Sequence, residues 1–100
     1  MDPTIEINER VDVVVIFRSH GDISSLCVPY RMRWRGRDIE LTELALRHPT
    51  VSGKRMIHVF HMSDGSNGYR LEFDAEALGW TLVAMIPGSS SAAEDIGDVA

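Results

Sequence analysis

The amino-acid sequence predicts an all-β protein, a single antiparallel meander of five or six strands that is strongly curled or closed into a small barrel. Three observations lead to this prediction. Apolar and polar residues alternate from residue 28 onward, as they do along half-buried strands. Turn-forming residues interrupt the alternation at 35–36, 64–68 and 74–79. When the strands between these turns are folded against one another, apolar residues meet apolar residues.

The first predicted strand covers residues 11–18. It is rich in β-branched residues and carries apolar side chains on both faces, with Val11 and Val13 on one and Val14 and Ile16 on the other. This pattern is typical of a strand that is covered on both sides. The sequence leaves open whether this strand pairs with the last strand or with another one.

The most informative segment is a predicted hairpin from Tyr30 to Leu41. Gly36 can adopt the positive φ that a tight turn at Arg35-Gly36 needs. Cross-strand pairs of like or complementary character then stabilise the hairpin by ~0.2–1 kcal/mol each. On one face the pairs are Tyr30 with Leu41, Met32 with Ile39 and Trp34 with Arg37, and on the other they are Arg33 with Asp38 and Arg31 with Glu40.

Three further connections complete the predicted sheet. Residues 48–53 have the composition of a loop, and we expect Arg47 to pair with Lys54 across it. Residues 64–68 form a second loop, and residues 74–79 form a hairpin loop that Asp74 caps and in which Gly79 is left-handed. The predicted rows across the sheet are Tyr30, Leu41, Phe60, Leu71 and Leu82, then Met32, Ile39, Met62, Tyr69 and Ala84, and then Val28, Glu43, His58, Phe73 and Trp80.

Length and composition predict one domain. We expect an acidic N-terminal segment at 1–10, the β domain at 11–87 and a disordered acidic tail at 88–100, because the tail lacks aromatic residues and periodicity. The net charge of −5 comes from the two ends and argues against strong attraction to nucleic acid. The N-terminus lacks a signal pattern, no apolar run could span a membrane, and the single Cys27 excludes an internal disulfide. We therefore expect a cytoplasmic protein that does not contact membranes.

Three short motifs carry a resemblance to a known family. Trp34-x-Gly36-Arg37, followed by Leu71-x-Phe73-Asp74 and Trp80-x-Leu82, resembles a pattern in small bacterial β-meander domains of unknown function. Some of those domains occur in actinobacteria near translesion-polymerase genes. The family pattern usually has an aromatic residue two positions after the arginine, where this chain has Ile39. The resemblance, over roughly residues 28–86, implies the fold and a DNA-damage context, and it implies no catalytic residue.

Arginines of the predicted hairpin, with one from a later strand, form a candidate nucleic-acid surface. Proteins that bind single strands place basic groups and stacking aromatic residues on one accessible surface. Here the alternation separates the arginines from Tyr30 and Trp34, and acidic residues lie opposite two of them. We therefore favour a solvated, ion-paired face. The candidate binding residues are Arg31, Arg33, Arg35, Arg37 and Arg70.

Glu43 and His58 form a candidate acid–base pair, because the predicted register places them opposite each other on the apolar face. We favour the alternative that both reach water near the end of the sheet. His58 and His61 have metal-ligand spacing, but residues three apart on a strand point to opposite faces. The Asp64 loop lacks the glycine and glutamate of a calcium loop. We therefore expect no metal and no cofactor, and we interpret Cys27 as a core residue.

The predicted function is that of a small non-enzymatic binding or accessory module that acts on a protein partner. It would use a sheet edge, the arginine face or an uncovered part of the aromatic face. The strand edge at residues 28–35 could also pair two copies into a homodimer. The alternatives are a small β-barrel that binds single-stranded nucleic acid through the arginine face and, third, an enzyme that uses Glu43 and His58.

Overall fold

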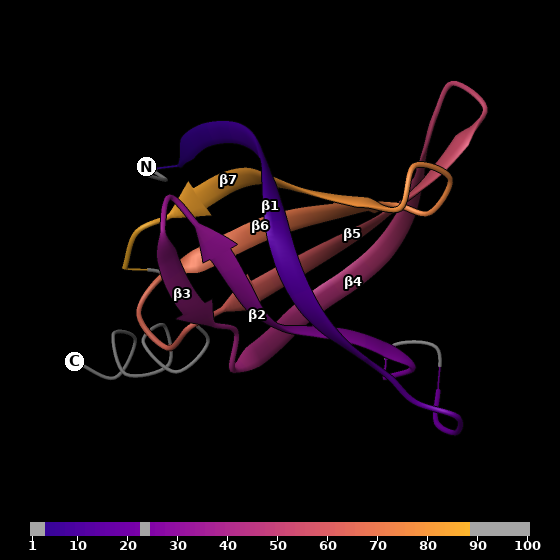
Figure 1. Cartoon of the computed structure of the whole chain (residues 1–100), viewed down its shortest axis with the longest axis horizontal. Helices are drawn as coiled ribbons and strands as arrows, with labels where there is room; N and C mark the ends of the chain where they lie inside the picture. Colours follow the sequence, from indigo (N-terminus) through magenta and orange to yellow (C-terminus); the bar gives the residue numbers. More distant parts are fainter. Residues whose placement is uncertain (1–3, 23–24, 89–100) are drawn as a thin grey trace.

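The computed structural model describes residues 4–22 and 25–88. Within these residues the chain forms one open sheet of seven antiparallel strands in the order β3-β2-β1-β7-β6-β5-β4 (Figure 1). The all-β antiparallel prediction is confirmed, but the sheet has seven strands where five or six were expected, and it is not closed into a barrel. The strands are β1 (Ile5–Phe17), β2 (Cys27–Trp34), β3 (Arg37–Glu40), β4 (Glu43–Ser52), β5 (Arg55–Ser63), β6 (Gly68–Asp74) and β7 (Gly79–Ile86).

Strand β1 lies in the interior of the sheet and pairs with both β2 and β7. It begins at Ile5, so most of the predicted N-terminal segment is part of this strand rather than separate from it. Val11 and Val13 pack against the core, whereas Val14 and Ile16 are exposed. The expectation that both faces of this strand are covered was therefore wrong, because its β-branched residues reflect strand propensity and not burial on two sides.

The hairpin of β2 and β3 has the predicted register, with Met32 opposite Ile39 and Arg33 opposite Asp38. Arg35 and Gly36 both have positive φ, 52° and 77°, as a two-residue turn of type I′ requires. Because β2 lies between β1 and β3, residues 31–33 are paired on both sides. The edge strands of the sheet are β3 and β4, so residues 31–34 are not part of the free edge that the sequence predicted at 28–35, whereas Val28 and Pro29 have no described strand on their outer side.

Tyr30 does not belong to the core row in which it was predicted. The pairing of β2 with β1 shifts at this point, since Val15 lies opposite Pro29 and Val14 opposite Arg31. Tyr30 is thus the additional residue of a β-bulge. As a result Pro29 is fully buried, while the side chain of Tyr30 is exposed.

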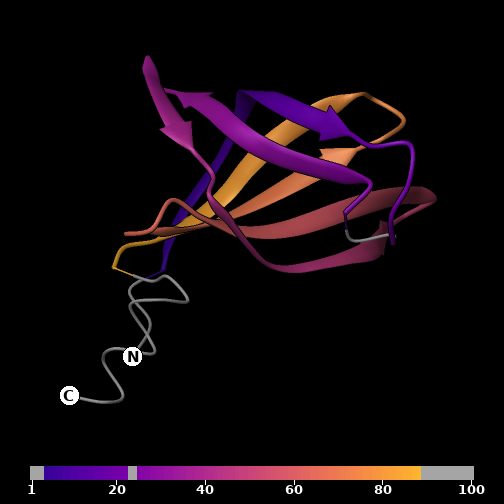
Figure 2. The ribbon, with the colours of Figure 1, turned by 90° about the horizontal axis from the view of Figure 1, so that it is seen from below.

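The connection between β3 and β4 joins the two ends of the sheet. The backbone N–H of Leu41 donates to the carbonyl oxygen of Tyr30 on β2, and that of Thr42 donates to Ser63 on β5, each at 2.8 Å. Successive residues therefore hydrogen-bond to opposite halves of the sheet. Figure 2 shows the resulting curl, in which β1 and β2 lie across from β4 and β5.

Strand β4 is the largest departure from the predicted fold. Residues 48–52 continue the strand, and the turn occupies Gly53 and Lys54, so Phe60 lies opposite Arg47 and not beside Leu41. The expected pairing of Arg47 with Lys54 was wrong. Pro49 is tolerated because β4 is an edge strand, where a missing N–H need not break the ladder.

The hairpins of β5, β6 and β7 follow the predicted pairing over most of their length. Phe60 lies opposite Leu71, and Phe73 opposite Trp80. A bulge between Arg70 and Leu71 then places Ala84 opposite Arg70, so the predicted Tyr69–Ala84 pair does not form. Asp74 caps the last turn as expected, but the left-handed residue is Leu78 (φ 57°) and not Gly79.

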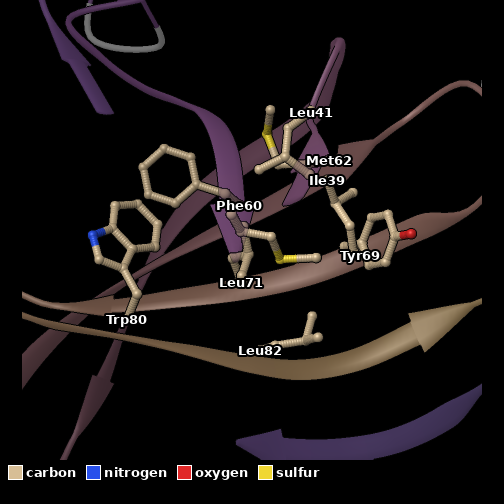
Figure 3. Packing of buried hydrophobic residues seen from close by; sticks show 9 residues of the cluster. Ile39, Leu41, Phe60, Met62, Tyr69, Leu71, Trp80 and Leu82 are labelled. Carbon is tan, nitrogen blue, oxygen red and sulfur yellow. The ribbon is translucent and has the colours of Figure 1, made fainter. Parts of the chain in front are cut away.

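The core lies inside the curl and collects side chains from both halves of the sheet (Figure 3). Met32 from β2 packs in one cluster with Phe60, Leu71 and Leu82 from β5, β6 and β7, and all four are fully buried. Apart from Gly88, the predicted tail lies outside the described residues.

We predict that Leu71→Ala lowers the free energy of unfolding by about 2–5 kcal/mol, because Leu71 is 0% exposed and its truncation leaves a cavity. Leu46→Ala is the matched control. Leu46 is 54% exposed on β4, so its truncation should change stability by less than about 0.5 kcal/mol. Urea denaturation followed by circular dichroism measures both. Equal effects would show that the two faces of the sheet are wrongly assigned.

Candidate functional site

The aromatic row of the core ends at an opening on the surface. The rings of Phe73 and Trp80 lie 4.9 Å apart between centroids, and those of Phe60 and Trp80 lie 5.3 Å apart. Beyond Phe73, which is only partly buried, a hollow of about 170 Å³ opens to solvent. We call it the aromatic hollow, and it is lined by Phe17, Cys27, Arg47, His58, Phe60 and Phe73.

The aromatic hollow lies where two strand edges separate. Strand β3 pairs with β2 only along residues 31–34, so Cys27 to Pro29 have no described strand on their outer side. Strand β4, which carries Arg47, is itself the edge of the sheet. The hollow therefore lies between the first residues of β2 and the middle of β4, in the gap that keeps the sheet from closing.

Arg47 is a cation in a mostly apolar setting. Its guanidinium carbon lies 5.7 Å from the centroid of the Phe60 ring, and its Nε–H is buried without a hydrogen-bond acceptor among the described residues. No described carboxylate forms an ion pair with it. A buried donor without an acceptor costs about 1–3 kcal/mol, and more when it is charged. Arg47 is thus placed at a cost to stability.

His58 fixes the orientation of Arg47. The guanidinium Nη2 donates to Nδ1 of His58 at 2.9 Å. Because arginine is always protonated and cannot accept, Nδ1 is the acceptor of the imidazole and its hydrogen is on Nε2. The imidazole ring lies 6.4 Å from that of Phe73, between centroids. His58 is therefore a neutral partner that leaves the positive charge of Arg47 uncompensated.

The thiol of Cys27 is less acidic than usual in this arrangement. Burial raises the pKa of its thiol, and the positive charge of Arg47 offsets this only in part. The thiolate, which is the nucleophilic form, is therefore disfavoured at neutral pH. The prediction that Cys27 is a packing residue fits this environment, since it packs against the core at the edge of the aromatic hollow.

The predicted acid–base pair does not form. Glu43 lies opposite Ser63, whereas His58 lies opposite Pro49, five residues further back along β5. At ~3.3 Å per residue this separates the two positions by about 16 Å. The error follows from the misplaced loop at 48–53. Oε1 of Glu43 is buried without a hydrogen-bond partner among the described residues, and the structure offers no explanation for it.

The predicted binding arginines do not form one surface. Arg31 and Arg33 line a hollow of about 280 Å³ with Asp12, Val13, Val14, Met32 and Asp38, and Arg33 pairs with Asp38 at 3.5 Å as predicted. Arg70 lies on β6, with β1 and β7 between it and β2, and lines a different hollow with His48 and His61. The hairpin arginines and Arg70 therefore do not share the candidate surface that the sequence predicted, because β3 and β4 are not neighbours in the sheet.

Arg35 at the tip of the β2–β3 hairpin is bound to β1. Its Nη2 donates to Glu9 Oε2 at 2.6 Å, and the indole N–H of Trp34 donates to the other carboxylate oxygen at 3.0 Å. The guanidinium lies 4.8 Å from the Trp34 ring centroid. The hydrogen bond from Arg35, and then that from Trp34, lowers the pKa of Glu9 below its ordinary value. Arg35 therefore stabilises the fold through its ion pair with Glu9, while Arg37 is exposed.

The histidines show no metal-binding arrangement. The rings of His48 and His61 stack at 5.6 Å between centroids, and burial, Arg70 and His48 lower the pKa of His61. In the part of the chain that the structure describes, no three histidine, cysteine or acidic side chains come together as metal ligands.

The carboxylate of Asp64 stabilises the loop between β5 and β6 by accepting hydrogen bonds from residues of this segment. Its Oδ1 accepts from the backbone N–H of Ser66 and Asn67, and its Oδ2 accepts from the hydroxyl of Tyr69 at 2.8 Å. Burial alone would raise the pKa of Asp64, but these hydrogen bonds outweigh it and lower the pKa below the ordinary value. Burial, and then the hydrogen bond to Asp64, raises the pKa of Tyr69 to about 12.

We predict that the Tyr69–Asp64 hydrogen bond stabilises the protein below pH 10 and is lost between about pH 10 and 12. The folded pKa of Tyr69 is raised above its unfolded value of about 10, so the contribution is complete below that value and disappears as the folded residue ionises. Tyr69→Phe should cost about 1.5–3 kcal/mol at pH 7. Urea denaturation at pH 7 and pH 11.5 measures the difference between the two proteins. A difference that does not shrink at the higher pH would contradict the assignment.

No motif or residue spacing in the sequence indicates the aromatic hollow. The predicted elements place Arg47 beside a loop and Phe17 near the end of a strand that is covered on both sides. The register shift between Leu44 and Leu46 brings Arg47 opposite Phe60, and the alternation in the sequence does not reveal such a shift. No helix among the described residues is long and apolar enough to cross a membrane.

No protein-family model, curated protein or solved structure matches this chain.

Proposed function

We propose that this protein is a non-enzymatic binding module that receives an apolar side chain of a protein partner in the aromatic hollow. The observation that carries this proposal is the uncovered end of the aromatic row. Phe17 is 72% exposed at the rim, and Phe73 is only partly buried behind it. A hollow of about 170 Å³ can hold one aromatic ring, since an apolar cavity of about 150 Å³ binds benzene.

The chemistry of the lining favours binding over catalysis. Cys27 is kept protonated by burial, and His58 is used in orienting Arg47. Among the described residues no carboxylate accompanies His58, so no acid–base pair is assembled in the hollow. Buried aromatic rings surrounded by a few polar groups are typical of pockets that anchor a partner's side chain.

We predict that an acetylated and amidated peptide with one central phenylalanine perturbs the backbone NMR signals of the residues that line the aromatic hollow. The same peptide with serine in place of phenylalanine should not. Phe17→Asn should weaken the interaction by about threefold to tenfold, because part of the ~1.5–3 kcal/mol gained by burying a phenylalanine ring is lost.

Leu78→Asn is the matched control for that experiment. Leu78 is 77% exposed and does not line the hollow, and asparagine tolerates its left-handed backbone. It should bind the phenylalanine peptide like the unmodified protein. Equal weakening in both variants, or binding of the serine peptide, would rule out the hollow as the recognition site.

Single-strand nucleic-acid binding is the second candidate function, and the bulge at Tyr30 favours it. The alternation in the sequence placed Tyr30 on the face opposite the arginines, but the bulge exposes its ring beside Arg31, whose guanidinium carbon lies 5.7 Å from the ring centroid. An exposed aromatic ring next to a cation is the combination on which bases stack. Nearby Asp12, Asp38 and Glu40 weaken the positive potential of this surface.

We predict that a short labelled oligothymidylate, if it binds, does so through Tyr30 and Arg31. Fluorescence anisotropy at low salt should then show weaker binding for Tyr30→Ala and for Arg31→Ala, while Arg70→Ala on the other surface leaves binding unchanged. Affinity should also fall steeply between about 50 and 200 mM salt. No binding at low salt would exclude this candidate.

A further inference from the structure

A hollow that binds only apolar side chains does not explain why the residue at position 47 is a charged arginine. An apolar side chain of similar size at this position would complete the lining of the hollow without leaving a cation in apolar surroundings. Arg47 lies instead with its guanidinium beside Phe60, an Nε–H without an acceptor and only a neutral imidazole as partner. A ligand that supplies a negative charge would offset this cost.

The shape of the guanidinium group indicates the class of anion. Its planar fork matches the two oxygens of a carboxylate, and such hydrogen bonds are among the strongest in proteins. The lining by Phe17, Phe60 and Phe73 requires that an apolar group be attached to that carboxylate. The free space of about 170 Å³ limits this group to roughly one aromatic ring or a branched aliphatic chain.

The strand edges beside the aromatic hollow indicate the source of the carboxylate. The outer backbone groups of β4 and of Cys27 to Pro29 have no described strand partner, so an extended peptide can hydrogen-bond along this gap. Pro29 and Pro49 lack an N–H and interrupt both edges, which disfavours a long added strand and leaves room for a short one. A peptide that ends in the gap presents its terminal carboxylate and its last side chain together.

We infer that the aromatic hollow binds the C-terminal residue of a protein partner, with the apolar side chain among the phenylalanine rings and the terminal carboxylate on Arg47. This inference rests on the proposed function and adds the identity of the group that is recognised. His58 is a positioning residue that holds the guanidinium in place through its Nδ1.

The test is an NMR titration of the full chain with three probes: an acetylated peptide that ends in phenylalanine with a free carboxylate, the same peptide as its C-terminal amide, and 3-phenylpropionate. The amide should bind about tenfold more weakly than the acid, because it lacks the charge-assisted hydrogen bonds. Signals of Cys27, Arg47 and His58 should move with the acid. The small acid should bind more weakly than the peptide, because it makes no contacts with the strand edges.

Two variants assign the carboxylate contact to Arg47. Arg47→Met keeps the size of the side chain and should bind acid and amide equally, while its thermal unfolding shows that it is folded. Arg47→Lys keeps the charge but loses the planar fork, so it should retain a smaller preference for the acid. This second variant keeps the test informative if methionine disturbs β4.

The outcomes separate the two proposals. Equal binding of acid and amide to the unmodified protein would overturn the carboxylate inference and leave the apolar receptor intact. Binding of 3-phenylpropionate as strongly as the peptide would show that the ligand is a free small acid and would overturn the assignment to a protein terminus. If no phenylalanine-containing peptide bound at all, both this inference and the proposed function would fail.

Discussion

Two backbone hydrogen bonds, from Leu41 to β2 and from Thr42 to β5, hold together the ends of a sheet that does not close. A single sheet of this size can bury only one face, and it can do so only if it curls over its own side chains. The link at residues 41–42 supports this curl at one end, where Met32 and Ile39 meet Met62. At the other end the described residues form no such link, and the aromatic hollow remains between β2 and β4. The core and the candidate site thus depend on the same short connection.

The hairpins could be predicted from the sequence because each is specified locally. Arg35-Gly36 allows only a tight turn, and the alternation on either side then sets the register of Met32 with Ile39. The same logic gave Phe60 opposite Leu71 and Phe73 opposite Trp80. In each case the turn and the two strands lie within a few residues of one another, so no distant contact was needed to find them.

The features that could not be predicted depend on partners that are distant in the sequence. Pro49 and Gly53 indicate a loop unless it is known that β4 is an edge strand, where proline is tolerated. That error displaced β4 by six residues, which created the false pair of Glu43 with His58 and concealed Arg47. The bulge at Tyr30 is equally invisible, because a bulge is defined by the opposing strand and not by its own residues. The candidate site could not be predicted because its lining combines Arg47, which the first of these errors displaces, with Phe17 at the end of β1 and Cys27 at the start of β2.

The interior position of β1 in the sheet has a consequence for how the chain folds. Its pairing with β7 joins Ile5 to Met85, so this part of the sheet forms only after the chain has closed its longest loop. The contacts within β4 to β7 are local and carry a much smaller entropy cost, so we expect these hairpins to form first and β1 to dock last. Phe17 belongs to β1 and Arg47 to β4, so the two sides of the aromatic hollow meet only in that last step. A partner that needs both sides would recognise the completely folded chain and would not bind its folding intermediates.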